Sequence, residues 1–209
     1  MALFITFEGG EGCGKSVQSK VLYEKLEQQA IPAVLTHEPG GTPLGDKINH
    51  LSKWSNAAIS PMTELLLFNA SRAQLIDGVI KHNLEKGKVV ILDRYTDSTI
   101  AYQGYGRGLD LEIVKKINQT ATQGVKPDLT ILLDMPSEGG LSRKKARKRD
   151  RFEKEILAYH QKVRQGYLKL AASEPKRWLV IDASQSKAKV AEVIWQRVNK
   201  LLPQLYYNS

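Results

Sequence analysis

A phosphate-binding pattern lies near the start of the chain. Residues 9–16 read Gly-Gly-Glu-Gly-Cys-Gly-Lys-Ser, which matches the Gly-x-x-x-x-Gly-Lys-Ser pattern of a P-loop. In such a loop, backbone N–H groups hold polyphosphate anions, and Gly9 and Gly14 allow the close backbone approach that this requires. Lys15 is expected on the β- and γ-phosphates, and the Ser16 hydroxyl on Mg²⁺. The pattern therefore predicts a site for a nucleotide polyphosphate.

The segments on either side favour this interpretation over a tight turn that binds nothing. An apolar run from Ala2 to Phe7 precedes the pattern, as expected of a central parallel strand. Apolar residues then recur at helical spacing from Val17 to Leu26. Strand, glycine loop and helix in this order are the structural context that a P-loop requires.

Charged side chains follow two further predicted strands, at the edge where parallel sheets bind ligands. Glu38 comes after strand 32–36, and Asp93 and Arg94 come after strand 88–92. Asp93 is expected to be a second Mg²⁺ anchor, usually through water, and Arg94 to dock an anionic acceptor. The alternatives are a plain Pro-Gly turn after Glu38 and a structural Asp93–Arg94 ion pair.

One predicted helix carries an aromatic ring and a guanidinium on the same face. Phe68 and Arg72 are one helical turn apart, so they project on one side. Phe68 alone would be assigned to the core, but Arg72 lies among apolar residues such as Leu65 and Leu75. A base that stacks on Phe68 and accepts a hydrogen bond from Arg72 explains both side chains.

A basic run contributes most of the net charge of the chain. The formal net charge is +9, and residues 143–151 read Arg-Lys-Lys-Ala-Arg-Lys-Arg-Asp-Arg. Such a run fits a solvated face, a nucleic-acid patch, or a mobile lid that brings cations to a transferring phosphoryl group.

Length and composition indicate one globular domain over residues 1–209, large enough to bury a core. Apolar residues make up 42% and charged residues 25%, which is ordinary for a soluble protein. No apolar run approaches the about 20 residues that span a bilayer, so no membrane association is expected. The single cysteine, Cys13, excludes an internal disulfide and fits the reducing cytoplasm.

Short apolar strands alternate with helical patterns along the whole chain. Strands are predicted at 2–8, 32–36, 88–92, 128–133 and 177–182, and helices at 15–29, 43–54, 62–86, 110–122, 152–173 and 186–202. Ser60 and Pro61 predict the start of the third of these helices, and Gly87 its end. The alternation indicates an α/β fold, a five-stranded parallel sheet with helices on both faces.

Six motifs, in this order and spacing, closely resemble those of bacterial thymidylate kinases. They are the P-loop, Glu38-Pro-Gly-Gly-Thr42, Leu67-Phe-x-Ala-x-Arg72, Asp93-Arg-Tyr95, Tyr102-Gln-Gly104 and Lys126-Pro-Asp-Leu129. Each motif is weak or moderate by itself, but the ordered set is specific and covers nearly the whole chain. The resemblance implies a P-loop nucleoside-monophosphate-kinase fold and phosphoryl transfer from ATP to thymidine 5′-monophosphate (dTMP), with Mg²⁺.

The resemblance also implies roles for individual residues. ATP binding is implied for Gly9, Gly10, Glu11, Gly12, Cys13, Gly14, Lys15, Ser16 and Arg143. Acceptor binding is implied for Glu11, Glu38, Pro39, Phe68, Arg72, Arg94, Ser98, Thr99, Tyr102 and Gln103. In this assignment Glu11 reaches the 3′-hydroxyl side, Arg72 the thymine O4 and Arg94 the 5′-phosphate. Ser16 and Asp93 are the implied metal anchors.

A lid over residues 136–151 is implied to supply a catalytic arginine. One branch of the family carries this arginine in the P-loop, where this chain has Gly12. The chain resembles the other branch, whose arginine comes from the lid. Arg147 is favoured, Arg149 stays open, and Lys15 and Arg94 complete the catalytic set.

The chemistry of the acceptor agrees with a cation-rich site. A phosphate monoester has a second pKa of about 6, so it is mostly dianionic at neutral pH. No general base is therefore required, and the problem is to bring two anions together. Lys15, Arg94 and the lid bring cations to this task.

Three other functions share part of the pattern. Another nucleoside-monophosphate or deoxynucleoside kinase shares the architecture, although an arginine at the base disfavours the amino group of cytosine. A GTP-binding switch protein needs an Asn-Lys-x-Asp segment, which is absent. A nucleic-acid-binding ATPase usually ends its Mg²⁺ strand with an acidic pair, where this chain has Asp93-Arg94. We expect ATP and dTMP as partners, no nucleic acid, and, from the resemblance, a homodimer formed through long helices such as 62–86.

Overall fold

The computed structural model describes residues 2–55, 57–143 and 150–202. Its strands are β1 (Leu3–Glu8), β2 (Ala33–His37), β3 (Val89–Asp93), β4 (Leu129–Asp134) and β5 (Trp178–Asp182). They form one parallel sheet in the order β2-β3-β1-β4-β5. The predicted strands and the parallel sheet are confirmed.

Helices connect every pair of consecutive strands. They are α1 (Lys15–Gln28), α2 (Pro43–Trp54), α3 (Pro61–Leu75), η1 (Ile76–Ile80), α4 (Lys81–Glu85), α5 (Thr96–Thr99), η2 (Ile100–Gly106), α6 (Leu111–Thr122), α7 (Ser137–Ser142), α8 (Leu157–Ser173) and α9 (Lys187–Asn199), of which η1 and η2 are π-helical. Within the described ranges, none of them is both long enough and apolar enough for a membrane span.

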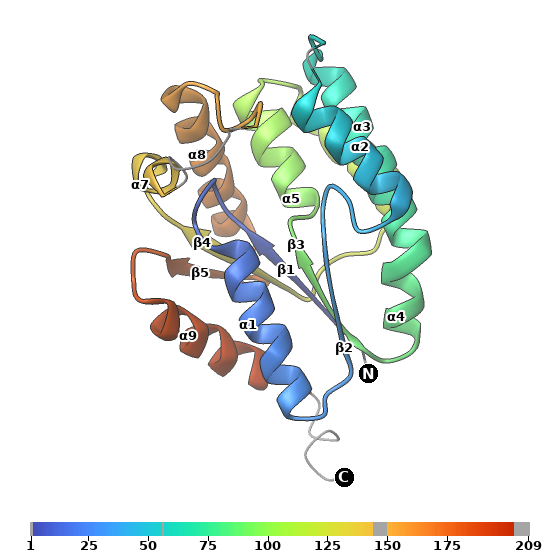
Figure 1. Ribbon diagram of the computed structural model, residues 1–209, viewed down its shortest axis with the longest axis vertical. Helices are drawn as coiled ribbons and strands as arrows, with labels where there is room; N and C mark the ends of the chain where they lie inside the picture. Colours follow the sequence, from blue (N-terminus) through green and yellow to red (C-terminus); the bar gives the residue numbers. More distant parts are fainter. Residues whose placement is uncertain (1, 56, 144–149, 203–209) are drawn as a thin grey trace.

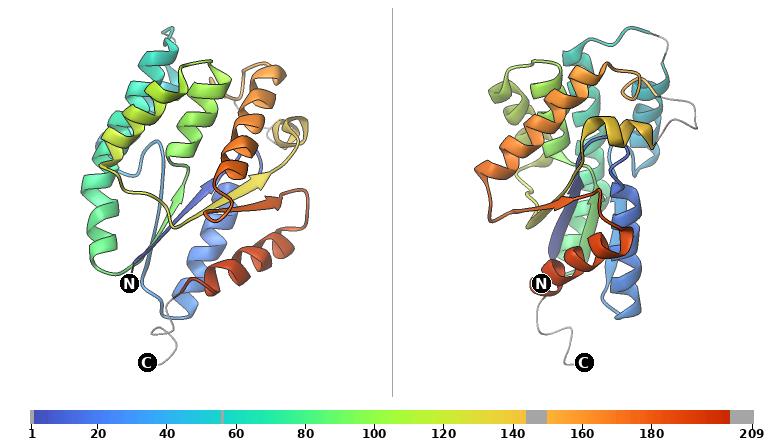
Figure 2. Two further views of the ribbon diagram at one scale, coloured as in Figure 1. Left: turned by 180° about the vertical axis from the view of Figure 1, so that it is seen from behind. Right: turned by 90° about the vertical axis from the view of Figure 1, so that its left-hand side faces the viewer.

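The sheet is covered on both faces, because its continuously apolar strands turn alternate residues to opposite sides. Ile5 of β1 and Ile91 of β3 belong to the core under α1 and α9. Phe4 and Val90, their neighbours in the chain, belong to the opposite core, under η1. Figure 1 shows α1 and α9 in front of the sheet, and Figure 2 shows α8 and the α5–η2 helix behind it.

The predicted helix 62–86 is observed as α3, η1 and α4, which follow one another without a break. Ser60 caps it, since its side chain accepts a hydrogen bond from the Thr63 N–H, and Pro61 is the first helical residue. Gly87 ends it with a φ of 73°. The prediction missed that the middle of this helix is π-helical.

The helix predicted at 152–173 begins five residues later, at Leu157. The Asp150 side chain accepts hydrogen bonds from the N–H groups of Phe152 and Glu153, each at 3.0 Å. An aspartate that bonds the backbone in this way stabilises a turn in place of a helix. The prediction of the helix start was therefore wrong, and the turn brings Phe152 to the site described next.

Candidate active site

A cavity of about 460 Å³ opens at the carboxyl edge of the sheet. This volume is in the range of small-molecule sites. Its wall contains residues from the P-loop and from the ends of β2 and β3, together with side chains of α3, α5 and η2. Of the described residues predicted for the site, the wall includes Glu11, Gly12, Gly14, Lys15, Ser16, Glu38, Pro39, Phe68, Arg72, Asp93, Arg94, Ser98, Thr99, Tyr102, Gln103 and Arg143.

The P-loop is preformed around its lysine. Gly9, Gly12 and Gly14 have positive φ angles of 138°, 70° and 97°, which side-chain-bearing residues rarely adopt. Lys15 Nζ donates to the carbonyl oxygens of Gly9 at 3.0 Å and Gly10 at 2.7 Å. This ammonium therefore lies inside the loop, at the start of α1, where the helix N-terminus already favours anions.

Cys13, Gly9 and Gly10 are absent from the cavity wall. The Cys13 thiol is buried and donates to the Gly10 carbonyl at 3.1 Å. Its side chain therefore packs beneath the loop and fills a small position there.

The two predicted metal anchors lie together. Ser16 Oγ donates to Asp93 Oδ2 at 2.5 Å, across the end of β3. A hydroxyl and a carboxylate are hard oxygen ligands, which suit Mg²⁺. Among the described residues no group of three or more His, Cys, Asp or Glu side chains forms a metal cluster.

Arg94 is held at the junction of the P-loop and the α5–η2 helix. Its backbone has a φ of 73°, an unusual conformation for a non-glycine residue. One guanidinium nitrogen donates to Glu11 Oε1 at 2.7 Å and to the Tyr102 hydroxyl at 3.2 Å. The other donates to the Gly9 carbonyl at 3.2 Å. The side chain is 18% exposed, so this cation borders the cavity.

The surroundings of Arg94 keep it charged. Burial lowers the pKa of Arg94, but the facing Tyr102 and Glu11 outweigh this and raise the pKa well above its usual value. Tyr102 and Tyr167 remain protonated, since burial raises the pKa of both phenols well above their usual value. The site therefore offers a permanent positive charge framed by neutral hydroxyl groups.

Arg72 is the most heavily bonded side chain of the predicted base pocket. Its donors reach Glu38 Oε2 at 2.8 Å, Asn69 Oδ1 at 3.0 Å, Asn118 Oδ1 at 2.8 Å, the Tyr95 carbonyl at 3.2 Å and Thr99 Oγ1 at 2.8 Å. Arg72 and Glu38 are each 3% exposed. Burial raises the pKa of Glu38, against the lowering effect of Arg72. All five N–H groups of this guanidinium have protein partners, so a base reached by Arg72 must share one of them.

Aromatic rings form another wall of the same pocket. The ring centroids of Phe68 and Phe152 are 5.7 Å apart, and those of Tyr102 and Phe152 are 6.3 Å apart. Phe68 comes from α3 and Tyr102 from η2, so two helices on one side of the sheet meet here. Rings at these distances provide an apolar surface on which a flat base can stack.

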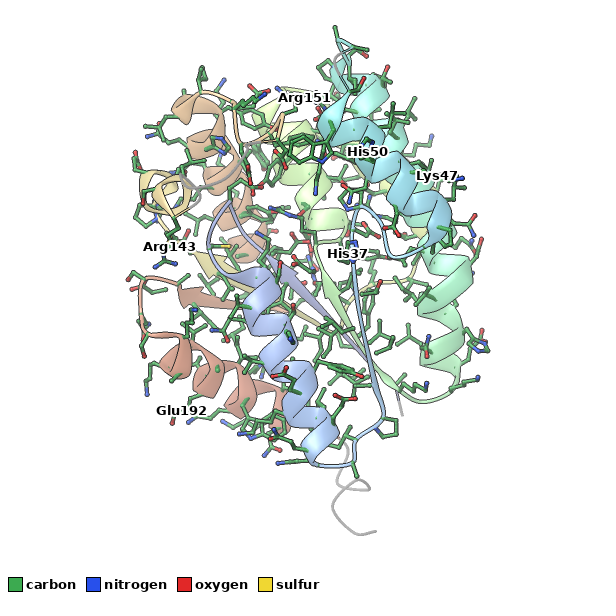
Figure 3. The ribbon with its side chains drawn as sticks, in the orientation of Figure 1. His37, Lys47, His50, Arg143, Arg151 and Glu192 are labelled. Carbon is green, nitrogen blue, oxygen red and sulfur yellow. The ribbon has the colours of Figure 1, made fainter. Side chains whose placement is uncertain are left out.

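The two described ends of the lid lie against different parts of the molecule. Arg143 donates to the Ala183 carbonyl at 3.4 Å, beside the loop after β5. Arg151 Nε donates to the Ser52 carbonyl at 3.1 Å, at the end of α2. Figure 3 shows Arg143 near α7 and Arg151 on the other side of the site. The predicted catalytic arginines, Arg147 and Arg149, lie outside the described residues.

Helix α7 and the P-loop touch through two glycines. A Cβ atom on Gly12 would lie 2.0 Å from the Gly140 carbonyl oxygen, and one on Gly140 would lie 2.1 Å from the Glu11 carbonyl oxygen. Neither position tolerates a side chain without movement of backbone. The P-loop position Gly12 is therefore closed by α7.

Several wall residues were missed by sequence reasoning. Lys53, Asp150, Phe152 and Glu153 line the cavity, and Asn118 holds Arg72 from behind. The signal for Asp150, Phe152 and Glu153 was Asp150-Arg-Phe-Glu153, an aromatic residue between acids at the end of the basic run. The pattern instead predicts a helix over 152–173 that begins at Phe152. Asn118 gave no signal, since it lies in an ordinary amphipathic helix.

Comparison with known proteins gives consistent results. A family model described as "Thymidylate kinase" matches residues 7–194. A thymidylate kinase of Dehalococcoides mccartyi is 59% identical over 203 residues, which cover 97% of this chain and 98% of that protein. One from Citrifermentans bemidjiense is 49% identical over 213 residues, with coverage of 96% and 95%. The crystal structure of thymidylate kinase from Ehrlichia chaffeensis aligns with a TM-score of 0.77 at 33% identity, covering 94% of this chain and 98% of that chain.

Proposed function

The chain belongs to the thymidylate kinase family, and we propose that it performs the reaction of that family with the residues of the cavity described above. The reaction transfers the γ-phosphoryl group of ATP to dTMP and produces ADP and thymidine 5′-diphosphate. The observation that carries the residue assignment is that the P-loop lines the same cavity as Phe68, Arg72 and Arg94.

The donor half of the site is the P-loop with α1. Backbone N–H groups of residues 9–16 surround the phosphates of ATP, and Lys15 exchanges its carbonyl partners for the β- and γ-phosphates. Arg143, beside Ala183, is available on the adenine side. Ser16 and Asp93 hold Mg²⁺, which, when bound, neutralises charge on the β- and γ-phosphates.

The acceptor half lies between the end of β3 and helix α3. The thymine ring stacks on Phe68, and its polar edge forms hydrogen bonds with Arg72 and Gln103. Thr99 and Pro39 complete the pocket. Arg94 binds the 5′-phosphate, and Ser98 orients Arg94 through a 3.3 Å hydrogen bond. Glu11 and Tyr102, which bond each other at 2.8 Å, face the sugar.

The chemical step needs positioning and charge more than proton transfer. An oxygen of the acceptor phosphate attacks the γ-phosphorus, and the bond from that phosphorus to the β–γ bridging oxygen breaks. The acceptor enters as a dianion, so no residue must remove a proton. Arg94 and Lys15 approach the transferring group from the acceptor and donor sides. Arg147, with Arg149 as the alternative, meets the remaining negative charge when the lid closes.

The homodimer and the cytoplasmic location are further parts of this proposal.

The proposed dimer surface contains exposed apolar side chains. Met62 and Leu66 on α3 and Ile113 on α6 are exposed by 37%, 51% and 48%. α3 and α6 pack side by side, so these apolar side chains can share one surface. A second copy of the chain is the partner that we propose for it.

The test is an ATP-coupled assay over a panel of nucleoside monophosphates. We expect dTMP to have the highest kcat/KM, dUMP to follow, and dCMP, dGMP and dAMP to react poorly. Omission of Mg²⁺ should abolish turnover. Preferred use of a cytidine or guanosine nucleotide would contradict the proposed function. For cytidine the reason is that its amino group donates where Arg72 also donates.

A further inference from the structure

Glu64 is a fully buried carboxylate next to the proposed base pocket. It lies on α3, one turn before Phe68 and two turns before Arg72, so the three side chains share one face. Arg107 donates to both of its carboxylate oxygens at 3.3 Å. Arg151 NH2 lies 2.6 Å from Glu64 Oε2. Two cations from different segments therefore hold this carboxylate in place.

A short hydrogen bond to Glu64 comes from the pocket. Gln103 Nε2 donates to Glu64 Oε1 at 2.6 Å. An ionised carboxylate only accepts hydrogen bonds, so only the NH₂ half of the Gln103 amide can face it. The reverse orientation would place two oxygens in contact. Since the oxygen and the NH₂ group of an amide have nearly the same shape, Glu64 decides which of them faces it and which faces away.

The orientation of the amide sets what Gln103 offers to a ligand. No residue in the described ranges donates to Gln103 Oε1, and Gln103 lines the cavity beside Phe68 and Arg72. The cavity thus presents an acceptor next to a guanidinium donor. Thymine carries the complementary pair, an N3–H donor next to the O4 acceptor. Cytosine carries the opposite pair, an N3 acceptor next to an amino donor.

We propose that Glu64 is a positioning residue for base selection. It accepts a hydrogen bond from Gln103 Nε2 and thereby holds Gln103 Oε1 toward the cavity as the acceptor for the thymine N3–H. Glu64 does not contact the substrate. The inference rests on the proposed base pocket, so the experiment must distinguish failure of the role of Glu64 from failure of the base-pocket assignment.

The main test measures base preference in Glu64→Gln. This change keeps the volume and replaces one acceptor oxygen by an NH₂ group. Arg107 and Arg151 still require an acceptor, so the remaining oxygen faces them and the new NH₂ faces Gln103, whose amide then reverses. We expect KM for dTMP to rise about tenfold, while the inhibition constant of dCMP, competing with dTMP, falls.

Glu155→Gln is the matched control. The Glu155 side chain accepts from Arg107 Nη1 at 2.6 Å, so it neutralises the same arginine, but no hydrogen bond identified among the described residues joins this side chain to the base pocket. Its replacement should leave the ratio of the dCMP constant to the dTMP KM within about twofold of the starting value. Should Glu64→Gln fail to fold by circular dichroism, Glu64→Asp provides the answer. It keeps the charge, shortens the reach toward Gln103, and should lower the same ratio.

Two results would overturn the inference. One is an unchanged preference in the Glu64 variants. The other is an equal weakening of dTMP and dCMP, as expected of a purely structural ion pair. Gln103→Ala separates this failure from failure of the pocket: if it retains the preference for dTMP, the base-pocket assignment is wrong. If Gln103→Ala loses the preference while the Glu64 variants retain it, only the role of Glu64 is wrong.

Discussion

At the scale of single residues, Arg72 and Arg94 are held in different ways. Arg72 is 3% exposed, and its ion pair with Glu38 is sealed from water. Arg94 is 18% exposed and pairs with Glu11 at the edge of the cavity. Arg94 can therefore exchange Glu11 for a phosphate. Separation of Arg72 from Glu38 would instead leave a buried carboxylate without its cation. Arg72 therefore stabilises the fold through a buried ion pair, whereas the ion pair of Arg94 can open toward the cavity.

Substitution of Arg72 should reduce stability as well as acceptor use. Arg72→Met leaves the Glu38 carboxylate buried without its cation, and the loss of one partner of such a pair lowers the free energy of unfolding by about 3–5 kcal/mol. The double variant Arg72→Met/Glu38→Gln should recover part of this loss, because it removes the unpaired charge. Urea unfolding of both variants measures the difference. Equal stability of the single variant and the parent would show that the Arg72–Glu38 pair does not contribute to the free energy of unfolding.

Lys15→Ala should abolish turnover and leave the fold intact. Lys15 Nζ bonds only the Gly9 and Gly10 carbonyls and the Cys13 sulfur in the described structure, so no buried carboxylate loses a partner. Its main task is to meet charge that develops on the γ-phosphoryl group. Turnover is measured by the coupled assay and the fold by circular dichroism. Near-normal activity of the folded variant would exclude this role.

At the scale of elements, the end of β1 connects three parts of the site. Glu8, the last residue of β1, accepts hydrogen bonds from the backbone N–H of Tyr95 at 2.8 Å and from Ser98 Oγ at 2.6 Å. The P-loop follows directly in the chain, and Gly12 at its apex touches α7. The central strand thus positions the phosphate loop, the turn that carries Arg94, and the start of the lid.

The contact between the P-loop and α7 can be tested with a pair of alanine substitutions. Gly12→Ala should lower the free energy of unfolding by about 2–4 kcal/mol, because it combines a left-handed φ with a backbone clash. Gly10→Ala is the control, since a Cβ at Gly10 meets nothing within 4 Å. Denaturant unfolding compares the two. Similar stabilities would mean that α7 moves away from the loop without penalty.

Glu8 predicts a pH dependence of stability. Burial, together with the nearby Asp97, raises the pKa of its carboxyl from 4.5 to about 7. Between these values the folded chain retains a proton that the unfolded chain has lost, so the free energy of unfolding falls as the pH rises. Each pKa unit corresponds to about 1.4 kcal/mol, so the total effect is of order 3 kcal/mol.

Glu8→Gln removes this titration. The free energy of unfolding of the variant, minus that of the parent, should increase by of order 3 kcal/mol between about pH 5 and about pH 8. Taking the difference cancels groups that titrate equally in both proteins. Parallel stability profiles of the two proteins over this range would contradict the raised pKa.

At the scale of the whole molecule, the site spans segments from most of the chain. The cavity wall runs from Glu11 to Glu153, and the described ends of the lid contact opposite flanks of the site. We propose that closure of the lid brings the P-loop flank and the α2 flank into one enclosure and so excludes water from the transferring phosphoryl group. Met62, Leu66 and Ile113, which belong to the surface that we propose for the homodimer, do not line the cavity.

Leu66→Asp should convert the proposed homodimer into a monomer. Leu66 is 51% exposed, so a charge there does not disturb the core of the monomer, but it would be buried without a partner in a dimer. Light scattering coupled to size-exclusion chromatography measures the mass. Leu44→Asp, on α2 and also exposed by 50%, is the control for a charge on a different surface. A parent chain that is already monomeric would contradict the dimer.

The sequence alone determined the class of fold, because periodicity is a local property. Runs such as residues 89–92 are apolar on both faces of a strand, and this implied a parallel sheet between helices. The glycines and the lysine of the P-loop have their conformation and role within eight consecutive residues, so that motif was readable without neighbours. The order of the motifs was sufficient to indicate the family.

Only the tertiary structure decided how charged side chains are paired, because those partners are far apart in the chain. Arg72 meets Glu38 and Asn118, and Glu64 meets Gln103, Arg107 and Arg151, through contacts that no local pattern encodes. The start of α8 was likewise decided by a side chain, Asp150, that bonds the backbone where periodicity favoured a helix. In a densely packed interior, the environment of a charge is set by whichever segments the fold brings together, and this is why residue types were predictable here and their partners were not.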